Sequence, residues 1–481
     1  MARLLDNLTG LFRRDEKSIN AQSNGFWRGR FVRGRFDAAQ TTSDNQKHWA
    51  AADGFSADLA ASPEVRRQLR ERSRYEVANN SYARGIVLTI ANDTIGTGPR
   101  LQLLSDDTDL NRQVERDFAA WSSVVGLPEK LRTMRMARCQ DGESFALLMA
   151  NPKINHAIQM DVQLIEADRV AGELTFTPRD NDIDGVKLDE HGNPVSYRVL
   201  KKHPGGQSFS VSEDANIIPA NAMIHCFRSD RPQLHRGIPE ITPALPLFAQ
   251  LRRFTLAVIT AAESAANFAG ILYTDAPASG EADAVEPMDL IELERNMLLT
   301  MPGGWKMSQL QPEQPATTYA EFKHEILNEI ARCLNMPYNI AAGNSSGYNY
   351  SSGRLDHQTY FKAIRVDQDF IARTVLDRIL HIWLTEYLLA SNKPVSRILP
   401  PHQWFWDGME HVDPYKEANA QKLRLASNTT TLAYEYARQG RDWEEELRQI
   451  AREKDLMREL GLGGDEISKP QTSAMENNAN G

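Results

Sequence analysis

The sequence has few cysteines and no long apolar run. Only three of its 481 residues are cysteines (Cys139, Cys226 and Cys333), and they form no C-x-x-C or Cys/His spacing. This odd number of separated cysteines favours free thiols in a reducing compartment over a disulfide framework. The longest strongly apolar stretch is residues 254–262, whereas a membrane span needs about 20 residues. The first residues contain no apolar segment typical of a secretory signal. We therefore expect a soluble chain made inside the cell, with no membrane partner.

The sequence also lacks a basic excess. It has 55 lysines and arginines against 64 aspartates and glutamates, a net charge of −9. Proteins that grip DNA over their whole surface are normally basic, because neutralising phosphates drives that binding. The acidic balance thus argues against tight non-specific DNA binding. There is no G-x-x-x-x-G-K-[ST] motif, which excludes a P-loop motor. With 41% hydrophobic residues the chain is not disordered as a whole, and its length predicts about three domains.

Two local patterns look like active or metal sites, but their surroundings do not fit. The Gly-Asn-Ser-Ser-Gly sequence centred on Ser345 matches G-x-S-x-G. That motif needs a strand before the serine and a helix directly after it, whereas here a helix and Pro337 precede it. Residues 180–185 match the first half of an EF-hand loop, but His191 stands where a bidentate glutamate is needed. The sequence therefore predicts an acidic turn at residues 180–185, and no catalytic, cofactor or metal site.

The hydrophobic periodicity predicts a mainly helical α+β fold. Apolar residues at steps of three and four, with capping residues, predict helices near residues 62–80, 81–93, 108–121, 244–269, 320–336 and 354–389, and again after residue 413. Short β-prone runs bounded by Gly, Asn or Pro predict strands at residues 145–149, 160–165, 196–200 and 222–227. Residues 339–353, rich in Gly, Ser, Asn and Tyr, are expected to form a loop.

Two segments differ from the rest in charge. Residues 1–55 combine nine basic residues with interleaved aromatic ones. This pattern predicts a flexible arm that docks on a partner protein or a neighbouring subunit, with nucleic-acid contact as the open alternative. The insert between the helices at 244–269 and 320–336 is acidic. Its carboxylates include Glu281, Asp283, Glu286, Asp289 and Glu292.

Several short motifs in a fixed order resemble a known family. They are Ile224-His225 with Arg231-Pro232 and Arg236-Gly237-Ile238-Pro239, then Ile330-Ala331-Arg332 up to Pro337-Tyr338, then Asp413-Pro414-Tyr415-Lys416-Glu417-Ala418, and finally Gly440-Arg441-Asp442-Trp443. Together with Asn79-Asn80, their order and spacing over residues 60–465 resemble the lambda-type family of tailed-phage portal proteins.

The resemblance implies a function in the phage particle. It implies a dodecameric ring at one capsid vertex, assembled in the host cytoplasm and kept in the virion. The ring would be a passive channel for double-stranded DNA during packaging and ejection. Its partners would be further copies of itself, passing DNA, the terminase large subunit, the major capsid and scaffold proteins, and a head–tail connector or adaptor. No cofactor and no enzymatic activity are implied.

The resemblance also assigns parts and site residues. It implies an N-terminal arm (1–55), a wing (56–240 with 354–412), stem helices (241–270 and 319–336), a clip (271–318), a tunnel loop (337–353), a crown (413–465) and a disordered tail (466–481). The DNA-facing candidates are Asn344, Ser345, Ser346, Tyr348, Tyr350, Lys306 and Lys323. The acidic residues of the insert would face the terminase. The wing–stem hinge would contain Arg231, Pro232, Arg236, Gly237 and Pro239.

The residue pattern supports a ring independently. Two apolar helices that bracket an acidic insert suit a helical hairpin whose second face meets the next subunit, since a closed ring needs heterologous interfaces. Repeated acidic segments would repel phosphates and let DNA slide. Two alternatives stay open at this point. One is a cytosolic helical scaffold or adaptor unrelated to DNA transport, and the other, less favoured, is a serine hydrolase using Ser345.

Overall fold

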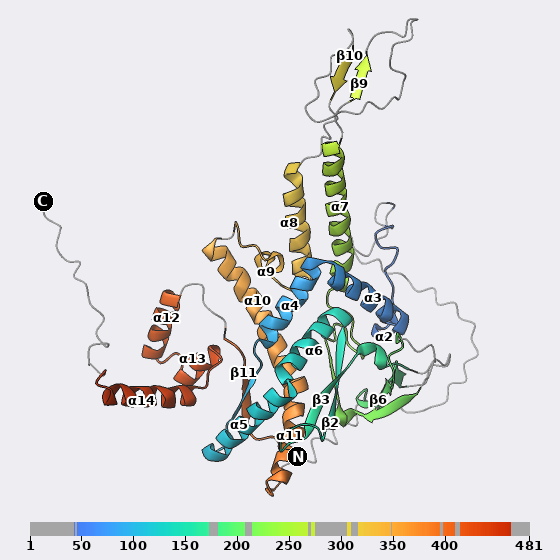
Figure 1. Cartoon of the computed structure of the whole chain (residues 1–481). Coiled ribbons are helices and arrows are strands. Elements are labelled where there is room, and N and C mark those ends of the chain that lie inside the picture. Colours follow the sequence, from blue (N-terminus) through green and yellow to red (C-terminus); the bar gives the residue numbers. More distant parts are fainter. Residues whose placement is uncertain are drawn as a thin grey trace, which may run out of the picture. The chain divides into compact units, whose positions relative to one another are not determined.

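The structure is a computed structural model, and it describes residues 43, 46–172, 181–206, 214–267, 271–274, 305–308, 316–347, 349–394, 398–408 and 414–462. The chain divides into two units, Met1–Phe55 and Ser56–Gly481, and every element below belongs to the second. Figure 1 shows mainly helices with small antiparallel sheets. This confirms the predicted α+β class. In the part of the chain that is described, no helix is long and apolar enough to cross a membrane.

The first helices begin where their capping residues predict. Helices α2 (Ala57–Ala60), α3 (Pro63–Asn79) and α4 (Ser81–Ile95) follow one another. Ser62 caps α3 by accepting the N–H of Val65, with Pro63 at the first helical position. The side chain of Asn80 accepts N–H groups of α4 while its own N–H ends α3. One residue therefore ends one helix and starts the next.

Helices α5 (Thr108–Val125) and α6 (Leu127–Asp141) meet at a glycine. Gly126 has φ +63°, a left-handed conformation that few other residues adopt without strain. Helix α6 has no counterpart among the predicted helices. Its buried residues include Arg135 and Arg138 as well as leucines, so no apolar stripe marks it in the sequence.

The sheets are antiparallel and lie between the helices along the chain. In the three-stranded sheet, β2 (Glu143–Ala150) lies between β3 (Met160–Ile165) and β8 (Met223–Phe227). The four-stranded sheet contains β4 (Asp182–Ile183), β5 (Val186–Leu188), β6 (Pro194–Leu200) and β7 (Ala215–Pro219) in that order. The strands predicted at 145–149, 160–165, 196–200 and 222–227 correspond to β2, β3, β6 and β8. The predicted acidic turn joins β4 and β5, with Asp184 and Gly185 at positive φ.

Two large apolar clusters hold the helices together. In the first, Trp121 of α5 and Trp383 pack with Phe118, whose ring centroid is 5.1 Å from that of Trp383. The indole N–H of Trp121 donates to Met160 O at 2.8 Å, which joins this cluster to β3. In the second cluster, Phe248 and Leu327 lie with apolar side chains of α4 and α6. Each cluster thus joins segments that are far apart in sequence.

Helices α7 (Leu245–Asn267) and α8 (Ala316–Arg332) lie side by side (Figure 1). The ring centroid of Phe254 is 4.3 Å from that of Phe322. One face of the first turns of α7 is buried, with Leu245, Phe248 and Leu251, whereas Leu256 is 58% exposed. The strand pair β9 (Ile271–Thr274) and β10 (Trp305–Ser308) follows α7 and precedes α8 along the chain. The chain therefore returns from α7 to α8 through a hairpin that sequence periodicity did not predict.

The predicted loop at 339–353 is shorter than expected. A helix α9 (Tyr338–Ala342) follows Pro337, and α10 (Tyr350–Ile371) begins four residues earlier than predicted. The prediction of a loop was therefore wrong at both ends. A π-helical turn at Ala372–Leu376 separates α10 from α11 (Asp377–Ala390), where one continuous helix was predicted. Val375 and Leu376 of this turn are buried in the first cluster.

The last helices lie against an edge strand pair. Strand β1 (Arg100–Leu103) pairs with β11 (His402–Phe405). Helices α12 (Pro414–Ala426), α13 (Leu432–Arg438) and α14 (Trp443–Glu459) follow. The turn between α13 and α14 contacts residues 406–408 at Gly440, where a Cβ atom would lie 2.4 Å from the carbonyl oxygen of Trp406. Gly440 also has φ +71°.

We expect Gly440→Ala to loosen the C-terminal helices more than Gly461→Ala. Both glycines have left-handed φ, so both substitutions carry about 1 kcal/mol of backbone strain. Only Gly440 has backbone atoms within 4 Å of the added Cβ. Hydrogen exchange should accelerate throughout α13 and α14 in the Gly440 variant, and only in the last turn of α14 in the Gly461 variant. Equal protection in both variants would show that the close approach at Gly440 is unimportant.

Candidate functional site

The segment between β8 and α7, predicted as a wing–stem hinge, is centred on a buried ion pair. Arg236 and Glu143 are both 0% exposed in their side chains, with Nη2 and Oε1 2.6 Å apart. The Nε of Arg236 donates to the same carboxylate at 2.9 Å, and the N–H of Gly237 donates at 3.0 Å. Glu143 is the first residue of β2. The pair therefore ties the beginning of this strand to the chain that leads into α7.

His225 of β8 completes the surroundings of Glu143. Its Nε2 lies 3.1 Å from Oε2, and its ring stacks on Phe145 at 4.2 Å between centroids. Burial lowers the pKa of His225, although the hydrogen bond to Glu143 opposes that shift. Burial alone would raise the pKa of Glu143, but the charge of Arg236 and hydrogen bonds from His225 and Arg236 hold it well below its usual value. Glu143 is thus a stable carboxylate.

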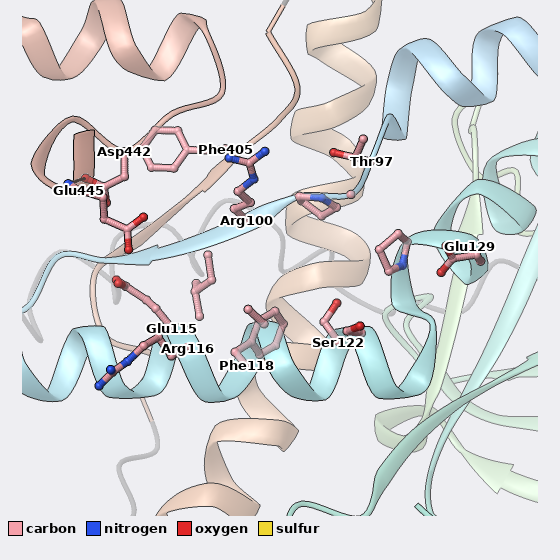
Figure 2. A pocket seen from close by; sticks show the side chains of 16 residues that line it. Thr97, Arg100, Glu115, Arg116, Phe118, Ser122, Glu129, Phe405, Asp442 and Glu445 are labelled. Carbon is pink, nitrogen blue, oxygen red and sulfur yellow. Dashed lines mark hydrogen bonds between the residues drawn. The ribbon is translucent and has the colours of Figure 1, made fainter. Parts of the chain in front are cut away.

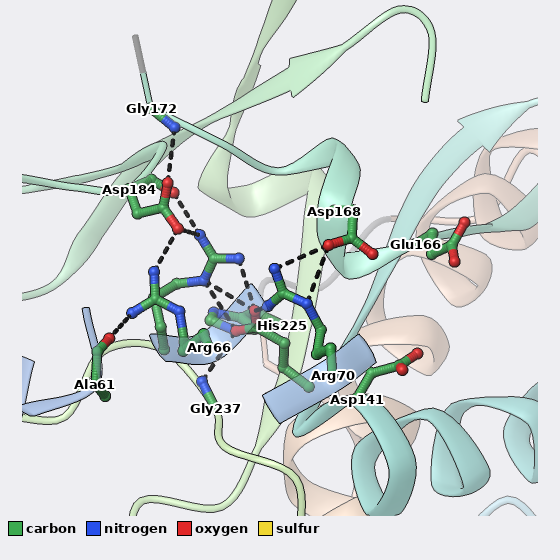
Figure 3. A network of polar contacts seen from close by, with 12 residues as sticks. Ala61, Arg66, Arg70, Asp141, Glu166, Asp168, Gly172, Asp184, His225 and Gly237 are labelled. Atoms are coloured by element: carbon green, nitrogen blue, oxygen red, sulfur yellow. Dashed lines mark hydrogen bonds and ion pairs between the residues drawn. The ribbon is translucent and has the colours of Figure 1, made fainter. Parts of the chain in front are cut away.

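Arginines of α3 extend this network toward the second sheet, and Figure 3 shows two of them, Arg66 and Arg70. Arg66, Arg70 and Arg74 are spaced by four residues and so lie on one face of the helix. Arg66 pairs with Asp184, which also pairs with Arg236 at 3.3 Å. Arg70 lies 2.9 Å from Asp168, and Arg74 lies 2.7 Å from Asp141. Helix α3 is therefore attached to the sheets by ion pairs.

One group of side chains in this network has the composition of a metal site. Glu166, Asp168 and His203 bring ligand atoms within 4.8 Å of one another. The guanidinium of Arg74 already lies 3.1 Å from Glu166 and 2.7 Å from Asp168. Because this cation neutralises both carboxylates, the group is explained as part of the ionic network.

A second buried network holds the other end of the same segment. Arg135 and Arg138 of α6 each lie 2.9 Å from an oxygen of Glu240, and all three side chains are at most 3% exposed. Asp367 of α10 pairs with both arginines. Burial opposes ionisation of Glu240, but the charges of Arg135 and Arg138 lower its pKa to about 2. The thiol of Cys333, just after α8, donates to the carbonyl oxygen of Glu240 at 3.1 Å.

Two glycines allow the chain to pass between these networks. A Cβ atom on Gly237 would lie 2.1 Å from the carbonyl oxygen of Gly142. A Cβ atom on Gly142, which has φ +92°, would lie 2.4 Å from the backbone of Ile238. We call residues 236–240 with Glu143, Arg135, Arg138 and Asp367 the ionic junction. It fixes the start of α7 against α6, α10 and β2.

The predicted hinge residues divide into two groups. Arg236, Gly237 and Pro239 are buried in the ionic junction, whereas Arg231 and Pro232 are exposed. Their partners were not predicted. The sequence signal for this network was the spacing of Arg66, Arg70 and Arg74, since basic residues at steps of four lie on one helix face. Nothing local marks Glu143 or Glu240, because their partners are about 100 residues away.

The predicted tunnel-loop residues do not assemble into a chemical site. Asn344, Ser345 and Ser346 are exposed, and the side chain of Asn344 accepts the N–H of Ser346 at 2.9 Å. Tyr348 lies outside the described residues, and Tyr350 is the first residue of α10. The element before Ser345 is helix α9 rather than a strand, so the geometry of a nucleophile elbow is not present.

The remaining candidates are placed only in part. Lys323 of α8 has its Nζ 5.0 Å from the ring centroid of Tyr82, and the hydrogen bond to Tyr82 raises its pKa. Lys306 pairs in register with Tyr273 in the β9–β10 pair. The acidic candidates lie outside the described residues: Glu281, Asp283, Glu286, Asp289 and Glu292. Within the described residues, Lys323 therefore contacts aromatic side chains of its own chain.

The sequence matches proteins of known kind. A family model described as phage portal protein, lambda family, matches residues 43–368. The chain is 26% identical over 428 residues to a probable portal protein of Halomonas phage phiHAP-1, covering 82% of this chain and 81% of that one. It is 20% identical over 463 residues to the portal protein of Escherichia phage N15, covering 85% of this chain and 87% of that one. A solved chain from the neck of an empty GTA particle shows 14% identity and a TM-score of 0.49, covering 77% of this chain and 94% of that one.

We expect Glu240→Gln to destabilise the protein strongly and to change its response to acid. The substitution leaves Arg135 and Arg138 buried with one carboxylate instead of two, which costs about 3 kcal/mol of unfolding free energy. Because the pKa of Glu240 is lowered to about 2 from 4.5, its stabilisation is present above pH 4.5 and lost as the pH falls toward 2. Denaturant unfolding between pH 2 and 7 measures both effects.

The matched control is Arg373→Ala, which removes an exposed pair with Asp369 within α10 and the π-helical turn. It should cost less than about 0.5 kcal/mol. If Glu240→Gln were no more destabilising than this control, the ionic junction would not be a structural requirement.

Proposed function

This chain belongs to the lambda family of phage portal proteins, and we propose that it forms a twelve-subunit ring at one vertex of the capsid. A portal protein is a structural part of the phage particle rather than an enzyme, and that is the role of this chain. The observation that carries the proposal is the family match over residues 43–368. The paired helices α7 and α8 around an inserted hairpin support it.

We propose that different segments of the chain form the different parts of the subunit in the ring. Residues 56–240 with 354–412 form the wing, and 241–270 with 319–336 form the stem around the channel. Residues 271–318 form the clip, 337–353 the tunnel loop and 413–465 the crown. In support of a stem in a ring, Leu256 and Ile259 of α7 are 58% and 47% exposed in the single chain. A second apolar face on this helix suits contact with a neighbouring subunit.

The ionic junction has a role in this proposal as a rigid joint. A stem helix that transmits force between wing and clip needs a fixed start, and α7 begins five residues after Glu240, following a 3-10 turn at Thr242–Ala244. Arg236 and Glu240 pair with different residues. Separating either pair would leave a buried charge without its partner, which is strongly unfavourable. The junction therefore keeps the angle between stem and wing constant while the exposed part of α7 packs against its neighbours.

We propose passive passage of double-stranded DNA through the ring. The exposed residues Asn344, Ser345 and Ser346 offer polar contact to passing DNA, and Lys306 and Lys323 offer weak steadying charges. The acidic insert repels phosphates and presents a surface to the terminase large subunit. The capsid and scaffold proteins and the head–tail connector are the other proposed partners. Weak contact is required because a strongly bound duplex would not slide.

We expect the ring to be visible by electron microscopy. Purified full-length protein should show rings with a central hole about as wide as a DNA duplex. Class averages should show twelve subunits. A monomer by light scattering at every salt concentration and protein concentration would contradict the proposal, and would favour a scaffold or adaptor unrelated to DNA transport.

We also expect the charge of the acidic insert to affect packaging. Reversing Glu281, Asp283 and Glu286 to lysine should slow DNA packaging in an in vitro assay with terminase, while the ring stays intact. Repulsion of phosphates becomes attraction, and the surface that faces the motor changes sign. As a control, reversing Glu64, Glu71 and Asp109 to lysine adds the same charge outside the insert. The proposed role of the insert fails if both triple variants package at the same rate.

A further inference from the structure

A hollow lies where the start of α14 meets β1 and α5. It has a volume of about 450 Å³, and Glu115 and Arg100 line it together with Asp442 and Glu445 (Figure 2). A second hollow of about 300 Å³ lies beside it and shares Glu115, Asp442 and Glu445. Glu115 therefore stands between two openings at one contact. This contact joins the C-terminal helices to the rest of the unit.

Two hydrogen bonds from β1 hold the two sides together. The guanidinium of Arg100 donates to the carbonyl oxygen of Gly440 at 3.2 Å. The side-chain amide of Gln102 donates to Asp442, which also caps α14 by accepting the N–H groups of Glu444 and Glu445. These polar contacts to β1, together with the close approach of Gly440 to residues 406–408, therefore hold α14 in position.

Like charges face one another across the same contact. Figure 2 shows Glu115 pointing from α5 toward Asp442 and Glu445. The Oε1 of Glu115 accepts the N–H of Leu103 at 2.6 Å. Glu444, Glu445 and Glu446 occupy the first turn of α14. An ionised Glu115 would therefore lie half-buried against the acidic start of a helix.

The cations around Glu115 have other partners. On α5, Arg112 pairs with Asp109, and the Nε of Arg116 donates to a backbone carbonyl oxygen. On α14, Arg448 pairs with Glu444 at 2.7 Å. At the start of α6, Glu129 adds a further carboxylate and pairs with Arg132. Among the residues that the structure describes, no ion pair is formed by Glu115.

The sign of the pH dependence follows from these surroundings. Burial raises the pKa of Glu115 to about 7; the hydrogen bond from the N–H of Leu103 opposes that shift, and the charges of Asp442, Glu445 and Glu444 add to it. Away from the contact this pKa would return toward 4.5. A raised pKa means that the docked form binds the proton more tightly. Docking is therefore favoured fully below pH 4.5, and this contribution is lost as the pH rises through 7.

We propose that Glu115 is a proton-operated latch that holds α13 and α14 on β1 when its carboxyl is neutral and releases them when it is ionised. The latch lies within one chain and needs no ring, so it stands or falls independently of the proposed function. In a portal ring it would make the position of the crown respond to pH near neutrality.

Spin-label distances in the full-length protein test the latch. One label goes on exposed Ala120 of α5 and one on exposed Glu453 of α14, with Cys333 replaced by serine and labelled chains diluted with unlabelled ones. The wild-type background should give a short, narrow distance at pH 5.5 and a longer, broader one at pH 8.5, because the stabilisation from the proton is lost by the time the pH passes 7. Glu115→Gln should keep the short distance at both pH values, since it resembles the neutral carboxyl.

Two comparisons make the result decisive. Glu129→Gln removes a carboxylate that lines the same hollow but is 66% exposed and already paired. It should keep the wild-type midpoint. Gln102→Ala weakens the hydrogen bond to Asp442 and should lower the midpoint, because less ionisation is then needed for release. A wild-type distance that does not change with pH, or a Glu115→Gln variant that keeps the wild-type midpoint, would overturn the proposal.

Discussion

The ion pair between Glu143 and Arg236 is the constraint on which this architecture depends. Both side chains are completely buried, and an unpaired charge in such a place would cost many kcal/mol. Neither residue can therefore move without the other. Because Glu143 begins β2, His225 lies in β8 and Arg236 precedes α7, the pair fixes three segments at one carboxylate. The arginines of α3 add a fourth segment, since Arg66 and Arg236 share Asp184.

A second ion-pair network holds the other end of the segment that leads into α7. Glu240 lies four residues after Arg236 and pairs with arginines of α6. Asp367 of α10 pairs with the same arginines. The chain between the two networks is so close to β2 that Gly142 and Gly237 leave no room for a Cβ atom. Helix α7 thus starts from a fixed root and becomes exposed farther along, from Leu256 onward. A helix that is held at one end and exposes apolar residues farther along suits a subunit whose remaining contacts come from its neighbours.

Local chemistry was sufficient to predict much of the fold. Ser62 and Asp442 cap helices as their positions indicate. The strands β2, β3, β6 and β8 overlap the predicted runs. Helix α6 was missed because arginines replace apolar residues on its buried face. The π-helical turn after α10 was missed because it keeps the apolar side chains facing the core.

The candidate site was harder to predict than the fold. Arg236 and Gly237 were identified from their motif, but the carboxylate that explains them is 93 residues earlier in sequence. Ion pairs over such separations leave no periodic trace, and one sequence does not show which charges are buried. The interpretation of the motif as a hinge therefore missed its main physical property, which is that its charges cannot leave their partners.

The acidic excess of the chain has two different consequences in the structure. Glu143 and Glu240 are surrounded by arginines, which lower their pKa values, so their contacts do not change near neutral pH. Glu115 is half-buried near other carboxylates, which raises its pKa to about 7. The same residue type thus makes a permanent joint before α7 and a reversible contact at α14. What separates them is whether an arginine faces the carboxylate. A subunit built this way can keep the start of α7 fixed while its C-terminal helices change position.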